Sequence, residues 1–272
     1  MPEYAKDPVF FSRMEYKRFP LPDLPADELM RYVWDVEEVR DVMSIRAWLS
    51  ASDLRGRELD TLWVSDPEYA ATASYGADWG YYVGMDAIRA WYLNRHTEHR
   101  QAQKCAYEAA HPGTEATAGH GCCSMFPTTT PVIRVAGDGK TARGLWYIIG
   151  QRTDLKPDGC TADARWCCGR LAAEFVREAD GWKIWHLLDL NDMNYEAGTD
   201  YNGTPTYIPE ETDVMELEFG KPTIPITVHN SAFNWAETYP RTPEPYDTYD
   251  LKTGYGPEGH PAYLRLKKEG SV

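Results

Sequence analysis

The sequence predicts an α+β protein, and three observations support this. Helical periodicity dominates residues 27–97, four strand-like segments follow between residues 125 and 190, and two Asp-Gly turns join these segments in pairs. Asp-Gly between two apolar runs is a strong hairpin signal. Helices followed by an antiparallel meander form the α+β pattern.

Three helices are expected before the meander. The first covers residues 27–48, with apolar residues at helical spacing. The second begins near Asp53 and ends at Trp63, and the third covers residues 85–97, after the break at Gly84. Residues 69–75, between the last two, are strand-like.

Four strands are expected, at residues 125–135, 142–151, 166–177 and 182–190. The turns Gly137–Lys140 and Glu178–Gly181 join them in pairs. In the last strand, strict alternation places Trp182, Ile184, His186 and Leu188 on one face and Lys183, Trp185, Leu187, Asp189 and Asn191 on the other.

Proline divides the chain into three parts. Five of the 19 prolines lie in residues 1–25, which we interpret as an extended leader, and nine lie after residue 200. Residues 26–195 form the folded domain. In residues 196–272, proline argues against much helix, and the many aromatic residues argue against disorder. We therefore expect an arm that packs on the domain or on a partner subunit.

Composition excludes several classes of function. The chain has 272 residues, with 28 Lys and Arg against 42 Asp and Glu, and a net charge of −14. This acidity argues against nucleic acid and anionic membrane surfaces as partners, and no apolar run reaches the roughly 20 residues of a membrane span. The 18 Tyr and 10 Trp favour an aromatic pocket or interface.

The six cysteines lack zinc-ligand spacing, so we expect no metal site and reduced thiols in a cytoplasmic protein. Because no nucleotide-binding loop is present, we also expect no cofactor. The chemistry would then depend on general acid–base groups.

Several local strings carry a family resemblance. They are Leu62–Asp66, Gly80–Arg89, Gly137–Gly139, Gly169–Leu171 and Asp180–Ile184. In this order and spacing they resemble the SnoaL-like branch of the nuclear transport factor 2-like (NTF2-like) superfamily. The resemblance implies a cone, in which a curved antiparallel sheet packs on three N-terminal helices. It also implies a homo-oligomer, formed through the outer face of the sheet and the C-terminal arm.

That superfamily includes ketosteroid isomerases, scytalone dehydratase, polyketide cyclases and lyases of lignin-derived diaryl compounds. The resemblance favours a cofactor-independent lyase of a small phenolic or diaryl molecule, which would deformylate or dehydrate it through an oxyanion or quinone-methide-like intermediate. The alternatives are an isomerase, dehydratase or cyclase of polycyclic substrates, and a non-catalytic module for aromatic ligands or assembly. Fold alone does not choose among them.

The expected catalytic residues are His120, His111, Asp53, Tyr75 and Arg170. Among them, Asp53 is the position that matches the family's acidic residue between the first two helices. The expected substrate-binding residues are Trp79, Tyr81, Tyr82, Phe126, Thr129, Trp146, His186, Asp189 and Asn191. Three alternatives stay open: exposed loop positions for both catalytic histidines, a core position for His186, and a structural ion pair between Arg170 and Glu174.

Overall fold

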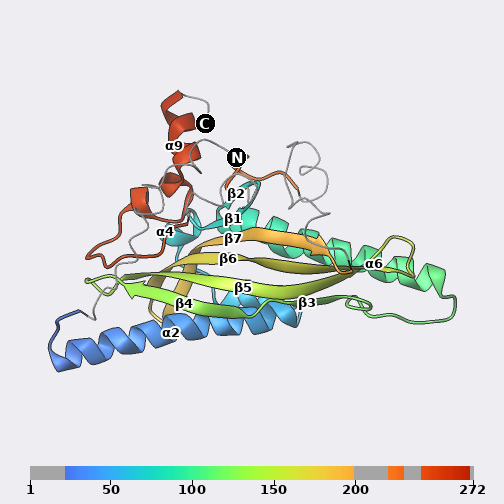
Figure 1. Ribbon diagram of the computed structural model, residues 1–272, viewed down its shortest axis with the longest axis horizontal. Coiled ribbons are helices and arrows are strands. Elements are labelled where there is room, and N and C mark those ends of the chain that lie inside the picture. The colour runs from blue at the N-terminus through green and yellow to red at the C-terminus, as the bar shows by residue number, and fades with distance from the viewer. Residues whose placement is uncertain (1–21, 199–219, 230–239, 270–272) are drawn as a thin grey trace.

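Most of the described helices lie in the N-terminal half of the chain (Figure 1). The computed structural model describes residues 22–198, 220–229 and 240–269. The helices up to residue 110 are α2 (Ala26–Ala51), α3 (Arg55–Thr61), the single turn α4 (Pro67–Ala70) and a continuous run of α5 (Met85–Ile88), the π-helix η2 (Arg89–Arg95) and α6 (His96–Ala110). The three expected helices are confirmed, and the third continues well past residue 97.

The described strands form one curved sheet of seven, whose first two strands lie between α4 and α5 in the chain. The strands are β1 (Ser74–Ala77), β2 (Gly80–Val83), β3 (Cys123–Met125), β4 (Thr128–Val135), β5 (Thr141–Leu155), β6 (Ala162–Glu178) and β7 (Gly181–Glu196). Their order is β2-β1-β7-β6-β5-β3, with β4 also paired to β5. Only β1 and β7 pair in parallel; the other pairs are antiparallel.

The expected meander and both of its turns are confirmed, whereas the strand expected at residues 69–75 is wrong in its first half. Pro67 occupies the first helical turn of α4, where its missing N–H costs nothing. The Asp66 carboxylate accepts a hydrogen bond from the Glu68 N–H and caps this turn. The strand β1 therefore begins only at Ser74.

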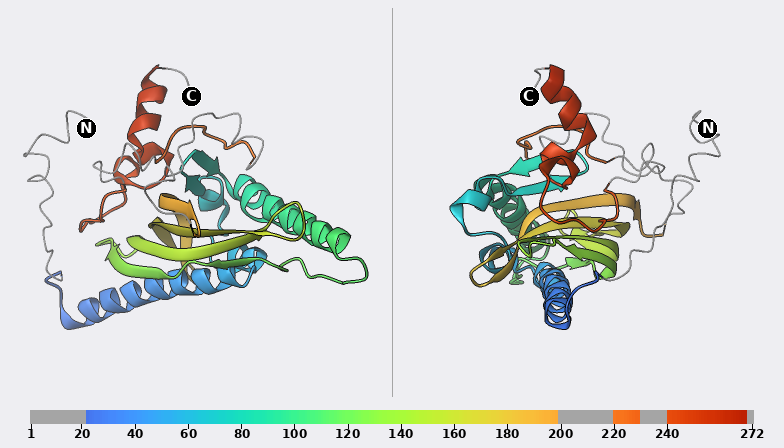
Figure 2. Two further views of the ribbon diagram at one scale, coloured as in Figure 1. Left: turned by 45° about the vertical axis from the view of Figure 1, so that its right-hand side comes forward. Right: turned by 90° about the vertical axis from the view of Figure 1, so that its left-hand side faces the viewer.

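The sheet separates two apolar cores. Its inner face packs on the helices through Trp63, Trp146, Phe175 and Leu187, among others. On its outer face, Leu188 and Leu190 pack against Val228 and Tyr255 of the C-terminal arm. Figure 2 shows the arm (orange to red) and α2 (blue) on opposite sides of the sheet. The α+β fold, an open curved sheet packed on N-terminal helices with a C-terminal arm, is thus confirmed.

Two β-bulges interrupt the alternation in β7. The pairing register with β6 shifts at Trp185 and again at Asp192. At each of these positions β7 has one extra residue without a partner in β6. Because of the first bulge, Ile184 and Leu187 both belong to the inner core, and Leu188 belongs to the outer one. The faces expected from strict alternation in residues 182–191 are therefore wrong.

The described parts of the arm are mostly irregular. Ile224 and Tyr81 exchange two backbone hydrogen bonds, which extends the sheet at β2. The turns η3 (Leu251–Thr253) and η4 (Pro257–Gly259) and the helix α9 (Pro261–Glu269) follow. The expected leader lies outside the described residues up to residue 21, as do arm residues 199–219, 230–239 and 270–272. Within the described part of the chain, no helix combines the length and apolarity of a membrane span.

Candidate active site

The inner face brings together two of the expected site residues, Tyr75 on β1 and Asp189 on β7. The parallel pairing of these strands sets Tyr75 opposite Leu187, two residues before Asp189. The Tyr75 hydroxyl donates a 2.8 Å hydrogen bond to the Asp189 carboxylate. Burial and the neighbouring Asp189 charge raise the pKa of Tyr75 well above its usual value, so this phenol stays protonated.

A second buried group lies beside this pair and involves Glu58, which is fully buried. Its carboxylate accepts hydrogen bonds from Tyr92 at 2.8 Å and from the Trp63 indole at 3.3 Å, and lies 3.3 Å from the Arg46 guanidinium. Burial lowers the pKa of Arg46, but Glu58, Tyr92, Tyr75 and Asp189 together outweigh it and raise this pKa. Burial and Glu58 raise the pKa of Tyr92 to about 12.

Aromatic rings connect the two groups. Trp91, which is half-buried, stacks on Tyr82 with ring centroids 4.3 Å apart and contacts Tyr75 edge-on at 4.7 Å. The Trp79 ring also meets Trp91 edge-on, and its indole N–H donates to the Tyr82 hydroxyl. We call Tyr75, Trp79, Tyr82, Trp91 and Tyr92 the aromatic cluster. It offers both flat ring faces and hydroxyl groups.

Asp53 contacts His96, which was not among the expected site residues. The His96 Nε2 atom is in hydrogen-bond contact with an Asp53 carboxylate oxygen at the junction of η2 and α6. Asp53 has a left-handed backbone conformation with φ of 57°, which is uncommon outside glycine. Burial and the charges of Arg55 and Arg100 outweigh Asp53 and lower the pKa of His96 to about 4. Its ring is therefore neutral at neutral pH.

The pair can act as a base. If His96 Nε2 carries the proton and donates it to Asp53, then Nδ1 is left as the acceptor. This nitrogen has no hydrogen-bond partner among the described residues. The side chains are 15% and 38% exposed for His96 and Asp53, so small molecules can reach them.

Arg55 joins this pair to the aromatic cluster. Its guanidinium carbon lies 4.4 Å from the centre of the Tyr92 ring, and its Nη1 donates a 3.1 Å hydrogen bond to the Tyr92 carbonyl. Tyr92 in turn contacts Tyr75 at 5.2 Å between ring centroids. A continuous line of contacts therefore runs from Asp189 through Tyr75 and Tyr92 to Arg55, next to His96.

The two expected catalytic histidines lie elsewhere. His111 and His120 both pack on the Tyr107 ring, at centroid distances of 4.2 Å and 3.9 Å. Figure 1 shows that this end of α6 projects beyond the sheet. Among the described residues, neither histidine makes a hydrogen bond or ring contact with Tyr75 or Asp53.

Four more of the expected residues face away from the cone interior or support the strand edge. Arg170 makes two hydrogen bonds to Asp192 on the outer face, at 2.9 Å and 3.0 Å. The His186 Nδ1 atom lies 2.7 Å from a Glu174 carboxylate oxygen, and its Nε2 atom is in hydrogen-bond contact with the Thr72 carbonyl. Tyr81 is buried in the outer core, and Asn191 donates twice to Asp78.

The remaining three expected residues serve packing. Trp146 is buried against Phe175 in the inner core. Phe126 packs on the margin of that core, and the Thr129 hydroxyl donates to the Tyr147 carbonyl. These contacts bring none of the three to the Tyr75–Asp189 pair.

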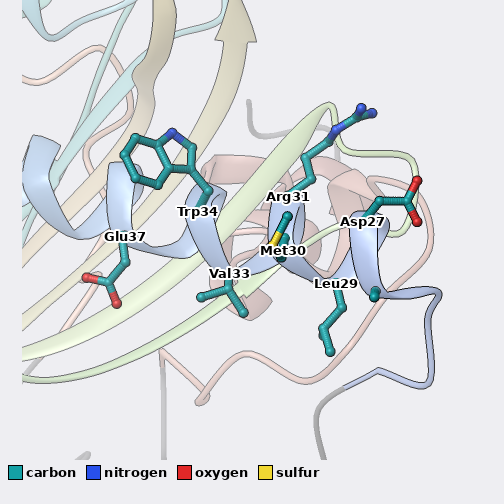
Figure 3. A pocket seen from close by; sticks show the side chains of 8 residues that line it. Asp27, Leu29, Met30, Arg31, Val33, Trp34 and Glu37 are labelled. Carbon is teal, nitrogen blue, oxygen red and sulfur yellow. The ribbon is translucent and has the colours of Figure 1, made fainter.

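A groove on α2 lies apart from this site (Figure 3). Its lining side chains all come from residues 26–37 of one helix, and the labelled side chains spread in different directions. The groove therefore offers no convergent polar groups. Among the described residues, no group of three or more His, Cys, Asp or Glu is placed to hold a metal ion.

A curved open sheet on N-terminal helices, with acid–base groups and aromatic rings between them, defines an NTF2-like protein. The family model of the SnoaL-like domain matches residues 31–187. The chain belongs to the SnoaL-like family.

Solved structures give weaker similarity. An NTF2-like protein with a cystatin-like fold from Novosphingobium aromaticivorans is 18% identical, with 65% of this chain and 90% of that chain covered and a TM-score of 0.38. The hexachlorocyclohexane dehydrochlorinase LinA-type3 from Novosphingobium barchaimii is 12% identical, with 64% and 97% covered and a TM-score of 0.42. Aln2 from a Streptomyces species is 16% identical, with 62% and 95% covered and a TM-score of 0.39. No curated protein matches the chain.

Proposed function

We propose that the protein is a cofactor-independent acid–base lyase of small aromatic molecules, phenolic or diaryl in type. The observation that carries this proposal is the contact between His96 and Asp53 beside the aromatic cluster. A neutral imidazole held by a carboxylate is a common arrangement for a general base. The aromatic cluster supports an aryl substrate because its half-buried rings provide stacking surfaces.

The residues would divide the chemistry as follows. In a dehydration, His96 Nδ1 takes a proton from carbon, and the hydroxyl leaves as water after it receives a proton from the imidazolium. In a deformylation of a phenolic diarylpropane, the benzylic hydroxyl first leaves with the phenolic proton as water, which gives a quinone methide. His96 then takes the proton of the primary hydroxyl, the adjacent carbon–carbon bond breaks, and formaldehyde leaves. The electron pair of that bond restores the aromatic ring as a phenolate, which takes the proton back from the imidazolium. Tyr75, whose one hydroxyl proton is donated to Asp189, would support the site by packing on Trp91 and Tyr92.

The experiment is turnover of phenolic diarylpropanes and of polycyclic ketones by the purified protein without added cofactor. Release of formaldehyde or water from the diarylpropanes is expected, and double-bond migration in the polycyclic compounds would favour the isomerase alternative. Binding of the aromatic compounds without any turnover would contradict the enzyme proposal and favour a binding module. His96→Gln should lower the rate by about 10²- to 10⁴-fold if this residue is the base.

A homo-oligomer is part of the proposal. The arm covers the outer face near Leu188, whereas four apolar side chains farther along that face stay exposed: Met125, Tyr147, Ile149 and Trp166. We call these four the outer sheet patch. An exposed apolar group of this kind on paired strands suits a second copy of the chain.

We also propose a cytoplasmic location. All six cysteines are described, and none forms a disulfide. Free thiols are typical of a reducing compartment.

A further inference from the structure

Arg55 is unusual among the buried and half-buried arginines near the site. Arg46 lies beside Glu58, Arg100 forms ion pairs with Asp53 and Asp154, and Arg152 pairs with Asp154. Arg55 forms no ion pair with any described residue. In a chain with a net charge of −14, an uncompensated cation at the site calls for an explanation.

The free edge of this guanidinium has a defined shape. Nη1 donates to the Tyr92 carbonyl, and the stacking on the Tyr92 ring fixes the plane. Nε is shielded from solvent and has no hydrogen-bond partner, and Nη2 makes no hydrogen bond with a described residue. A buried donor without a partner costs free energy until a ligand supplies one. Nη2, unlike Nε, is not buried, so a carboxylate that approaches the half-buried Arg55 from solvent can accept a charge-assisted hydrogen bond from it.

The residues around Arg55 indicate which other chemical groups the ligand contains. The Tyr92 ring under Arg55 also contacts Tyr75, and Trp91 stands next to both. A carboxylate bound at Arg55 therefore lies beside the aromatic cluster and beside the neutral ring of His96. A compound with an aryl ring a few bonds from its carboxylate would reach both places.

We propose that this site takes an anionic aromatic substrate, an aryl carboxylate, and that Nη2 of the Arg55 guanidinium binds its carboxylate group. The inference rests on the proposed function, because it names the substrate class of the same site. It does not require a particular bond to be broken. Binding alone can test it.

The test compares 4-hydroxycinnamate with methyl 4-hydroxycinnamate by isothermal titration calorimetry on the full chain. The ester keeps the ring and removes the charge. We expect the acid to bind about 10- to 100-fold more tightly than the ester, the range for a hydrogen bond between charged groups. Arg55→Gln should remove this preference by weakening the acid and leaving the ester unchanged.

The matched control is Arg57→Gln, since Arg57 is an exposed arginine two residues farther along α3. This variant should keep the full preference for the acid. Equal affinity of the two probes, tighter binding of the ester, or binding of neither would overturn the proposal. So would a preference that survives in Arg55→Gln. If turnover of neutral aromatic compounds that depends on His96 persists in such a case, the proposed function stands and only the substrate class is wrong.

Discussion

His96 differs from the other described histidines in its surroundings. His186 is buried, with Glu174 and the Thr72 carbonyl on its two ring nitrogens, and His111 and His120 pack on Tyr107. His96 alone combines a carboxylate contact on Nε2, an Nδ1 without a described partner, and a position beside the aromatic cluster. These three features together define the expected base.

The pH dependence of the reaction should reflect the lowered pKa of His96. The base acts when neutral, and its pKa is about 4, so kcat/KM should be flat above about pH 5.5 and fall as the pH drops through 4. Asp53→Asn should move this limb to still lower pH, because the Asp53 carboxylate raises the pKa of His96. The measurement is kcat/KM from pH 3.5 to 8.5, with circular dichroism at each pH to verify folding. A limb near pH 6.5 would contradict the assignment.

Asp78 predicts a second pH effect, this time on stability. Its carboxyl group is buried and accepts two hydrogen bonds from Asn191, yet burial outweighs them and raises its pKa to about 7. The folded state therefore prefers the protonated form. Stability should fall as the pH rises from about 4 to 7, by at most about 4 kcal/mol from this group.

Asp78→Asn should remove this dependence. The midpoint of thermal unfolding of the variant, relative to that of the wild type, should rise as the pH increases from 5 to 8. Asp86→Asn, at an exposed position at the start of α5, is the control and should show a constant difference. A constant difference for Asp78→Asn as well would show that Asp78 is ionised throughout this range.

The residues of the site were only partly predictable. Asp53 could be selected because it matches the family's acidic position, and Tyr75 and Asp189 because they lie in strand-like segments. His96 lies one turn after Tyr92, on the face of the third helix that points inward, so its position carried a signal. His96 was nevertheless not selected. The helix was expected to end at residue 97, one residue after His96, and the π-helical turn before His96 changes which side chains share a face. Arg55 had no signal, since its missing partner is a property of the folded state.

The C-terminal arm is held by contacts that only glycine permits. Gly254 passes over the buried pair of Glu174 and His186, to which Tyr249 also contributes its hydroxyl group. A methyl group at Gly254 would lie 2.6 Å from the Tyr249 hydroxyl and 2.9 Å from the Glu174 carboxylate. Gly254→Ala should therefore cost about 1–3 kcal/mol of unfolding free energy and speed proteolytic cleavage in the arm.

Gly119 supplies the matched control for this substitution. A methyl group there would meet no heavy atom within 4 Å. Gly119→Ala should change the unfolding free energy by less than about 0.5 kcal/mol, as other exposed substitutions do. Denaturant unfolding and limited proteolysis of both variants check the prediction. Equal stability of the two would mean that the arm does not pack on Glu174.

Helices and strands were well predicted where their formation depends on the local sequence. The four meander strands and their Asp-Gly turns follow from local patterns, and all are present. The bulges at Trp185 and Asp192 could not be read from β7 alone, because they depend on its register against β6. Each bulge moves every later side chain to the opposite face. The bulge at Trp185 is why Ile184 lies in the inner core and Leu188 in the outer one.

For the whole molecule, the exposed outer sheet patch predicts self-association. Tyr147 and Ile149 are 54% and 58% exposed, and neither belongs to the outer core that the described part of the arm forms with the sheet. Light scattering coupled to size-exclusion chromatography should give a mass near twice the 31.0 kDa of the chain. Ile149→Lys should shift the protein to the monomer, whereas Ile45→Lys, at an exposed isoleucine on α2, should not. A monomeric wild type would contradict the prediction.

The central claim is that His96, oriented by Asp53, is the base of the active site. The measurement is kcat/KM of the wild type, His96→Gln and His120→Gln. All three are assayed on the aromatic compound that the wild type turns over fastest. His96→Gln should lower kcat/KM by about 10²- to 10⁴-fold, and His120→Gln by less than about threefold. Full activity of His96→Gln, or a comparable loss in His120→Gln, would contradict it.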